Sequence, residues 1–278
     1  MHVVVWSDPC EFLERCRERW LANEAEDIAF LRLTPERLDD EAVALTVEEE
    51  SGAVRRTAVL RPSDQLLVSN GRPKDARLLT KWLVEQERLP PGLFGPATAC
   101  QEIARGLETS TKARYTVAKE LLHLHLETLV TPPSTSGSLR EAAPSDAEQL
   151  VRHREQLQLE LNTLRPFDSA ASVAEDLQAG RLHVWQDDEG EVVSSVSLYP
   201  DRVEGSVYLD HVYTVEERRG RGFASALVHA TCCKLVGQGL QARLSVDADN
   251  APAIAVYRRM GFAVDTKMQN LRRMVEHR

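Results

Sequence analysis

A short loop at residues 218–225 has the composition of an anion-binding turn. Its sequence is Arg-Arg-Gly-Arg-Gly-Phe-Ala-Ser, and Gly220 and Gly222 allow a sharp turn and a close approach of a ligand to the backbone. The apolar stretch that follows contains no Pro or Gly until residue 237, which predicts a buried helix. The unpaired N–H groups at the start of such a helix, together with its dipole, attract anions. The loop therefore predicts a phosphate cradle.

The loop matches neither of two common nucleotide-binding patterns. There is no GxxxxGK[ST], and the residues after Gly222 do not complete a GxGxxG; the pattern is R-x-x-G-x-A, from Arg219 to Ala224. Further along, Asn250 opens the stretch NAPAIAVYRRMGF, which contains Tyr257. This two-part arrangement resembles the GNAT family of acyl-CoA-dependent N-acyltransferases over roughly residues 139–278. A Rossmann-type nucleotide site is disfavoured because several strands precede the loop.

The resemblance implies that acetyl-CoA is the acyl donor and that backbone groups hold it. The implied contacts are Val212, Tyr213 and Thr214 along the pantetheine and acetyl arm, and Arg219, Gly220, Arg221, Gly222, Phe223, Ala224 and Ser225 around the pyrophosphate. Asn250 either caps a helix and contacts the ligand or only caps the helix. The sequence contains no HExxH motif or CxxC pair, so no metal is expected.

Two residues are candidates for proton transfer. By resemblance, Tyr257 stands where the family places the acid that protonates the departing thiolate, and a phenol pKa of about 10 is close enough to a thiol pKa of about 8.5 for this task. Asp210 lies where many members carry a Glu that faces the acceptor, and could orient an ammonium group or help to deprotonate it through water. His211 should face the opposite side of the strand unless a bulge intervenes. The alternatives are a core tyrosine and a structural aspartate.

The elements around these residues follow the order of a GNAT unit. Alternating β-branched and aromatic residues predict a strand over residues 207–215, and the helix after the loop leads to a strand at 242–246. A helix from Asn250 to Met260 and a last strand region at 262–274 complete the order β-α-α-β-β-β-α-β-α-β. The expected fold class is α/β with a mixed sheet, and a tandem arrangement of GNAT-like domains.

The first half allows two interpretations. We expect domain 1–130, a linker at 131–138 rich in Pro, Ser and Thr, and a catalytic domain at 139–278. The first domain shows strands, a turn at Asn70-Gly71 and then a helix, but it lacks the second glycine, the matching arginines and a counterpart of Tyr257. It is either a degenerate GNAT copy without a cofactor loop or an unrelated α/β domain.

Composition limits the classes of partner. The chain has 278 residues and a formal net charge of −9, with 28% charged residues, so neither nucleic acid nor an anionic membrane surface is an expected partner. Its five cysteines show no metal or redox spacing, and no apolar run approaches the length of a membrane span or a signal peptide. We expect a cytoplasmic enzyme, a monomer or weak homodimer, that acetylates a small-molecule or peptide amine. The alternative is a non-catalytic acyl-CoA-binding sensor or scaffold module.

Overall fold

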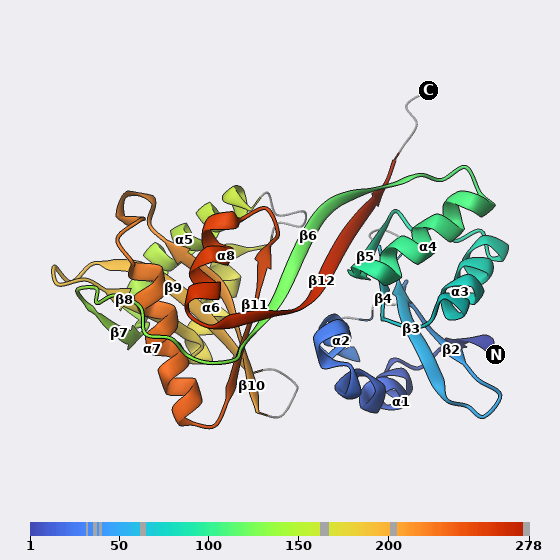
Figure 1. Ribbon diagram of the computed structural model, residues 1–278, viewed down its shortest axis with the longest axis horizontal. Coiled ribbons are helices and arrows are strands. Elements are labelled where there is room, and N and C mark those ends of the chain that lie inside the picture. Colours follow the sequence, from blue (N-terminus) through green and yellow to red (C-terminus); the bar gives the residue numbers. More distant parts are fainter. Residues whose placement is uncertain are drawn as a thin grey trace. The chain divides into compact units, whose positions relative to one another are not determined.

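The chain forms two compact units. The structure, a computed structural model, describes residues 1–31, 33–35, 38, 41–61, 65–161, 167–200 and 205–274. Unit 1 comprises Met1–His123 and Asp265–Arg278, and unit 2 comprises Leu124–Val264 (Figure 1). These units follow spatial contacts, whereas the boundaries at 130 and 139 follow the composition of the linker. The two divisions differ in two places: the linker at 131–138 is part of unit 2, and the chain from Asp265 onward is part of unit 1.

The first half of the chain supplies most of unit 1. Its elements are β1 (His2–Trp6), α1 (Pro9–Ala22), α2 (Glu24–Leu31), β2 (Val43–Glu48), β3 (Val54–Leu60), β4 (Leu66–Val68), α3 (Pro73–Glu85), β5 (Gly92–Pro96), α4 (Ala97–Ser110) and β6 (Tyr115–Leu126). The strand order in this unit is β1-β2-β3-β4-β5-β12-β6, where β12 is the last strand of the chain. β4 and β5 are parallel, because α3 forms the crossover between them.

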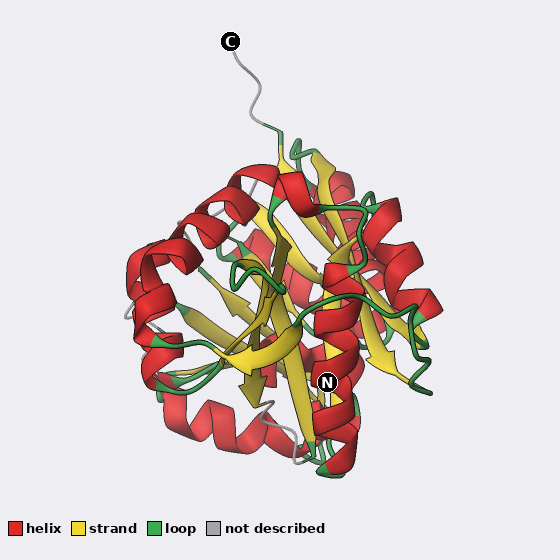
Figure 2. Ribbon diagram, turned by 90° about the vertical axis from the view of Figure 1, so that its left-hand side faces the viewer, coloured by secondary structure: helices red, strands yellow, loops and turns green. Residues whose placement is uncertain are grey.

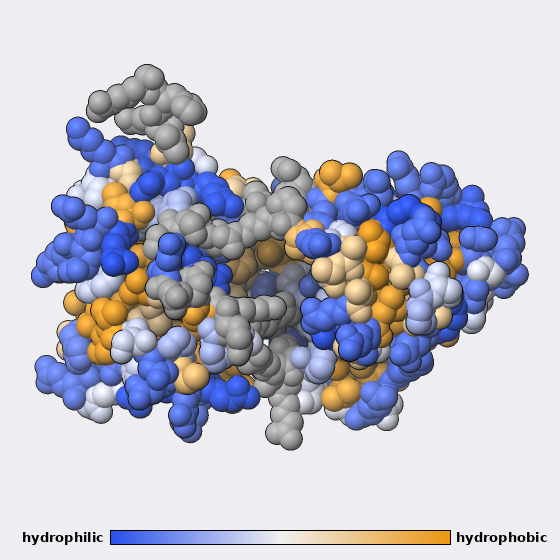
Figure 3. Space-filling model, turned by 180° about the vertical axis from the view of Figure 1, so that it is seen from behind, coloured by the Kyte–Doolittle hydropathy of each residue, from blue (hydrophilic) through white to orange (hydrophobic). Residues whose placement is uncertain are grey.

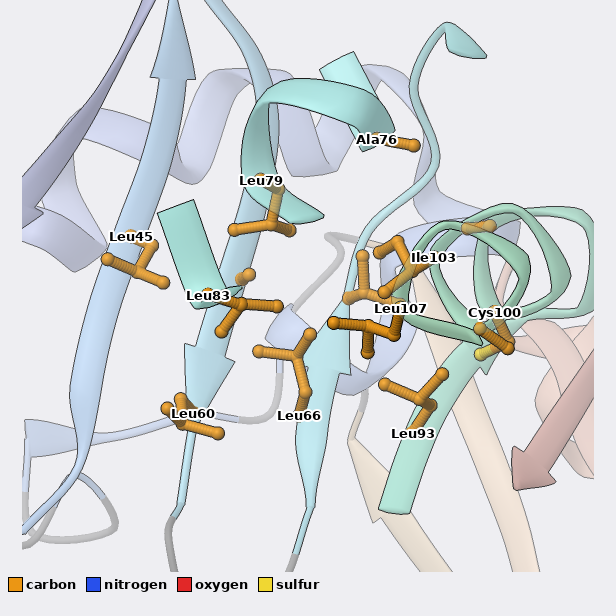
Figure 4. Close-up of a cluster of buried hydrophobic side chains, with 14 of the residues drawn as sticks. Leu45, Leu60, Leu66, Ala76, Leu79, Leu83, Leu93, Cys100, Ile103 and Leu107 are labelled. Carbon is orange, nitrogen blue, oxygen red and sulfur yellow. The ribbon is translucent and has the colours of Figure 1, made fainter. Parts of the chain in front are cut away.

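The core of unit 1 lies between its sheet and the helices α3 and α4. Leucines from both layers point toward one another, with Leu45 and Leu66 from strands and Leu79 and Leu83 from α3 (Figure 4). Helical spacing places these α3 leucines on one face, and their burial removes apolar surface from water. On another part of the unit, α1 starts at Pro9 with the Asp8 carboxylate accepting hydrogen bonds from the first-turn amides.

The second half of the chain repeats the same order of elements. They are β7 (Ser138–Glu141), a 3-10 turn (Pro144–Asp146), α5 (Ala147–Glu160), α6 (Ser169–Gln178), β8 (Leu182–Gln186), β9 (Val192–Pro200), β10 (Ser206–Thr214), a second 3-10 turn (Glu216–Arg218), α7 (Phe223–Gly237), β11 (Gln241–Asp247), α8 (Ala251–Arg259) and β12 (Phe262–Arg273). In unit 2 the strand order is β6-β11-β10-β9-β8-β7. The described elements of both halves therefore read β-α-α-β-β-β-α-β-α-β, the order that was predicted for the second half.

Helices cover both faces of the unit 2 sheet, and Figures 1 and 2 show helices on the two sides of the strands. Leu150 of α5 and Val173 of α6 pack with Leu182 and Val184 of β8. His183 lies between those two strand residues and therefore points to the other face, the one that α7 covers. Sandwiching the sheet in this way keeps the middle of β9 buried, including Val193 and Val196.

Hydrophilic residues predominate on the face drawn in Figure 3. On this face, hydrophilic residues are spread over each unit, and hydrophobic residues form smaller patches among the hydrophilic ones. Among the described helices, none combines the length and the hydropathy needed to cross a bilayer.

Candidate active site

A β-bulge and a parting of two strands create the site in unit 2. β10 and β11 are parallel and paired only from Ser206 to Leu209 on the β10 side, after which β10 continues along β9. The β9 pairing shifts between Asp210 and Tyr213, and His211 has a φ of 51°, so one extra residue bends the strand. The edge of β10 beyond the bulge is thus left without β11 as a neighbour.

The glycine loop delivers the start of α7 to this opening. Gly220 and Gly222 have φ values of 74° and 86°, a region that residues with a Cβ rarely adopt. No side chain caps α7, and the first helical hydrogen bond runs from the Ala226 N–H to the Gly222 carbonyl. The first-turn amides are therefore available to an external acceptor, and the first turn contains no acidic side chain that would compete with an anion.

A cavity of about 1010 Å³ brings most of the predicted cofactor residues together. Of those residues, it is lined by Val212, Tyr213, Thr214, Arg219, Gly220, Gly222, Phe223, Ala224, Ser225, Asn250 and Tyr257. Arg221 and Asp210 are the two predicted site residues that do not line it. The volume is at the upper end of that typical for ligand sites, which suits a long donor molecule such as acetyl-CoA.

The arginines around the loop are mostly engaged by carboxylates. Arg219 donates from Nη2 to both Glu160 oxygens, at 2.7 and 2.9 Å, and from Nε to the Thr214 carbonyl at 2.9 Å. Arg218 pairs with Glu189 at 3.2 Å and Asp187 at 3.5 Å. The Arg219 side chain therefore fixes the loop to α5, and the backbone amides at the start of α7 stay available to an anion.

Tyr257 and Asn250 come from opposite ends of α8. The Asn250 side chain accepts a hydrogen bond from the Ala253 N–H at 3.1 Å, so its capping role is realised, and it also lines the cavity. Tyr257 is 8% exposed, and its ring packs edge-on against Phe262. Burial, with a smaller contribution from the Asp210 charge, raises the pKa of Tyr257, so the phenol keeps its proton at neutral pH. Among the described residues, none forms a hydrogen bond with its hydroxyl.

Asp210 and His211 occupy the bulge beside the cavity. The Asp210 carboxylate accepts a hydrogen bond from the His211 N–H at 2.8 Å. The His211 ring lies edge-on to Phe167 and Tyr199, with centroid distances of 5.4 and 6.2 Å. Burial lowers the pKa of His211, and the neighbouring Asp210 charge partly opposes this, which leaves a largely neutral imidazole at pH 7.

Beneath the bulge lies a buried polar network that the sequence did not reveal. Arg154 of α5 pairs with Asp176 of α6 at 3.0 Å and donates to Ser197 Oγ at 2.6 Å. The Tyr199 hydroxyl donates to Asp176 at 2.8 Å. Arg154 and Asp176 are 3% and 1% exposed, so the pair is stabilised mainly by these surrounding hydrogen bonds. No local motif indicates such a network, because Arg154, Asp176 and the strand that carries Ser197 and Tyr199 lie about twenty residues or more apart in sequence.

His153 packs against β9 and β10 from the α5 side. It is 5% exposed, its Nδ1 lies 3.2 Å from Ser195 Oγ, and its ring centroid is 5.0 Å from that of Tyr213. Burial lowers the pKa of His153 to about 4, so the ring is neutral in the native protein at pH 7.

The linker between the two halves also contributes to the cavity. Thr131, Pro132 and Pro133 line it, although their composition predicts only a domain join. The consecutive prolines were the one available signal, since a Pro-Pro pair forms a stiff extended segment.

The corresponding position in unit 1 is filled by the protein itself. Gly71 lies between β4 and α3, and the Arg56 guanidinium lies so close that a Cβ on Gly71 would be 2.8 Å from Arg56 Nε. Arg56 is fully buried and donates to Glu102 at 3.2 Å. Asp75 accepts the Arg72 N–H at 2.8 Å, which places a carboxylate at the start of α3. An anion would meet the Asp75 carboxylate here, and a space occupied by the Arg56 guanidinium, whose charge is paired with Glu102.

Comparison with known protein families gives a match in the second half of the chain. Residues 148–262 match the family model described as "Acetyltransferase (GNAT) family", so the chain contains a GNAT domain. No curated protein sequence matches the chain.

Solved structures match the chain over almost its whole length. An acetyltransferase of the GNAT family from Colwellia psychrerythraea has a TM-score of 0.68 at 11% identity and covers 99% of this chain and 100% of its own. A GCN5-related N-acetyltransferase from Sphaerobacter thermophilus gives 0.67 at 18% identity, covering 98% and 95%. A tandem GNAT protein from the clavulanic acid biosynthesis pathway gives 0.59 at 14% identity, covering 97% of each chain. The prediction of a tandem GNAT-like fold is confirmed, and the first half has the fold of a GNAT-like unit.

His153 is expected to make the protein acid-sensitive. Its pKa falls from 6.5 to about 4 on folding, so the stabilisation is complete above pH 6.5 and is lost as the pH falls toward 4. Relative to His153→Gln, the wild type should lose up to about 3 kcal/mol more of its free energy of unfolding between pH 7 and pH 4. Urea denaturation at a series of pH values measures this. His2→Gln, at an exposed position, is the control, and equal pH dependence of the wild type and His153→Gln would contradict the assignment.

Gly222→Val should abolish close approach of a ligand to the loop. Valine would be strained at a φ of 86°, and its Cβ would lie 2.7 Å from Thr135 Oγ1. Loss of one or two hydrogen bonds to a charged group predicts an affinity for acetyl-CoA at least roughly tenfold weaker by calorimetry. Gly237→Val, where nothing lies within 4 Å, is the matched control. Wild-type affinity in folded Gly222→Val would rule out this loop as the cradle.

Titration should find one acetyl-CoA site per chain. Unit 1 places Arg56 and Asp75 where a cofactor phosphate would have to lie, so only the α7 loop can bind it. Isothermal titration with a known fraction of active protein measures the stoichiometry. Two equivalent sites would show that the unit 1 loop opens to accept the donor.

Proposed function

We propose that this protein is an N-acetyltransferase that transfers the acetyl group of acetyl-CoA directly to a primary amine. The observation that carries the proposal is the single cavity that contains the uncapped start of α7, the free edge of β10 and the Tyr257 side chain. The GNAT domain at residues 148–262 supports the donor. The cavity suits this donor, because the unpaired amides at the start of α7 can bind its pyrophosphate and the edge of β10 can bind its pantetheine arm.

When bound, acetyl-CoA supplies an activated thioester. In direct transfer, a C–N bond forms as the C–S bond breaks, the amine gives up a proton and the thiolate gains one. Tyr257 is assigned as the proton donor to sulfur, because its hydroxyl is protonated, lines the cavity and has no partner among the described residues. The raised pKa of Tyr257 makes early proton loss unfavourable, so donation occurs only as negative charge develops on sulfur.

Asp210 is assigned to the acceptor side. It lies at the bulge, next to the strand edge that holds the donor, and its charge is felt by both Tyr257 and His211. A carboxylate in that position attracts an ammonium group and, through water, assists its deprotonation. We propose a small-molecule or peptide amine as the acceptor and cytoplasm as the compartment, with the chain acting as a monomer or weak homodimer.

The rival function is a binding module that holds acyl-CoA without turnover. The observation in its favour is that Asp210 does not line the cavity and already accepts the His211 N–H. Turnover with any amine separates the two functions, since a binding module would show affinity for acetyl-CoA without acetyl transfer.

Tyr257→Phe should separate binding from chemistry. The substitution keeps the ring that packs against Phe262 and removes only the hydroxyl, so affinity for acetyl-CoA should change little. Turnover should fall by roughly 10²–10⁴, the range for losing a general acid. Thiol release from acetyl-CoA, with an amine panel or as slow hydrolysis, measures it. Tyr115→Phe, which removes a half-buried hydroxyl that donates to the Pro90 carbonyl in unit 1, is the control. Wild-type turnover where chemistry limits the rate would remove Tyr257 from the mechanism.

Asp210→Asn should act on the amine instead. Without the carboxylate, the enzyme depends on amine that is already neutral, so the rise of rate with pH should move to higher pH. Initial rates from pH 6 to 10 with one accepted amine measure the shift. Asp8→Asn, at a helix cap in unit 1, should leave the profile in place. An unshifted Asp210→Asn profile would leave the residue a structural role.

A further inference from the structure

Residues 131–138, which join the two repeats, are fixed to unit 2 at both ends. Before the segment, the Val130 N–H donates to the Met260 carbonyl at 3.1 Å. Near its end, the Trp185 indole N–H donates to the Ser136 carbonyl at 2.9 Å. Gly137 has a φ of 100°, and a Cβ there would lie 2.3 Å from the Gln186 carbonyl oxygen, so only glycine fits this close approach. The segment is therefore a positioned strap and not a free tether.

Between these anchors, the strap borders the cavity. Pro132 and Pro133 line it. Pro133 is exposed and Pro132 half-buried, so both can gain contact with a bound molecule. Their rings fix φ, and Pro133 also restricts the residue before it, so the wall is ordered before any ligand arrives. Preorganisation of this kind lowers the entropic cost of binding.

Thr135 brings a hydroxyl to the glycine loop. A Cβ built on Gly222 would lie 2.7 Å from Thr135 Oγ1, which places this oxygen beside the residue that precedes α7, at the border of the cavity that Thr131, Pro132 and Pro133 line. Thr135 is half-buried, and among the described residues nothing shares a hydrogen bond with its hydroxyl. A hydroxyl can donate to an anion held by neighbouring amides, and hydrogen bonds to charged groups are the stronger ones.

We propose that residues 131–138 are part of the donor-binding site, with the Thr135 hydroxyl donating to the phosphate group at the α7 loop and Pro132 and Pro133 forming a wall against the bound donor. The inference rests on the proposed function, because it takes acetyl-CoA as the ligand of this cavity. It assigns binding residues outside the loop and strand that the sequence motif covers. The joining segment thereby acts in recognition as well as in connection.

The first test uses two replacements of Thr135. Thr135→Val keeps the shape and removes the hydroxyl, and should weaken acetyl-CoA binding by roughly tenfold or more, the value of one hydrogen bond to a charged group. Thr135→Ser keeps the hydroxyl and should bind within about threefold of the wild type. Calorimetry with acetyl-CoA measures both. Equal affinity of the valine and serine variants would overturn the role of the hydroxyl.

The second test removes the proline wall. The double variant Pro132→Gly/Pro133→Gly loosens the segment and should bind acetyl-CoA roughly tenfold more weakly, since each Pro-to-Gly change adds conformational freedom that binding must remove. The matched control is Pro90→Gly/Pro91→Gly, a proline pair in unit 1, which should leave affinity unchanged. Hydrogen exchange supplies a second readout, in which acetyl-CoA should protect the amides of residues 134–136 in the wild type.

The outcomes separate this inference from the proposed function. If the wild type binds acetyl-CoA and Gly222→Val does not, but Thr135→Val and the 132/133 variant bind normally without protection of the strap, the inference is wrong and the function stands. If the wild type itself does not bind acetyl-CoA, the proposed function is wrong, and the inference that rests on it is wrong as well.

Discussion

The unsatisfied amides at the start of α7 are the constraint around which unit 2 is organised. A helix start without a cap is unfavourable unless water or a ligand pairs with its N–H groups. Gly220 and Gly222 hold the loop in conformations that keep these amides turned toward the cavity. The parting of β10 from β11 opens the space in front of them, and the bulge at His211 produces the necessary bend. The uncapped helix start, the parted strands and the bulge each leave backbone groups without their usual partners, and a ligand in the cavity can supply those partners.

The two repeats resolve the same structural problem in opposite ways. In unit 1, Asp75 pairs with the backbone at the start of α3, and Arg56 fills the space beside Gly71. In unit 2, no side chain caps the start of α7, and among the described residues nothing lies within 4 Å of a Cβ built on Gly220. An identical order of elements therefore supports two outcomes, and the difference depends on a few side chains around one turn. The fold sets where a ligand can bind, and the local residues decide whether it does.

Local sequence patterns predicted much of the fold and part of the site, because turns, helix caps and strand alternation depend on residues that are close in sequence. The α7 loop, Tyr257 and Asn250, which the resemblance to the GNAT family singled out, line one cavity. Arg221 and Asp210 do not line it, because the outward direction of a loop residue and the effect of a bulge depend on tertiary packing. The pairing of β12 with β5, the Arg154–Asp176 pair and the course of the linker join residues far apart in sequence. No local pattern specifies such contacts.

The central claim is that acetyl-CoA binds this chain at the α7 loop and not at the equivalent turn of unit 1. Titration of the ¹⁵N-labelled protein with acetyl-CoA, followed by backbone amide chemical shifts, tests it most directly. The account predicts the largest shift changes at the amides of residues 220–225, while those of residues 70–75 stay unchanged. Large changes at 70–75, or none at 220–225 under saturating acetyl-CoA, would contradict it.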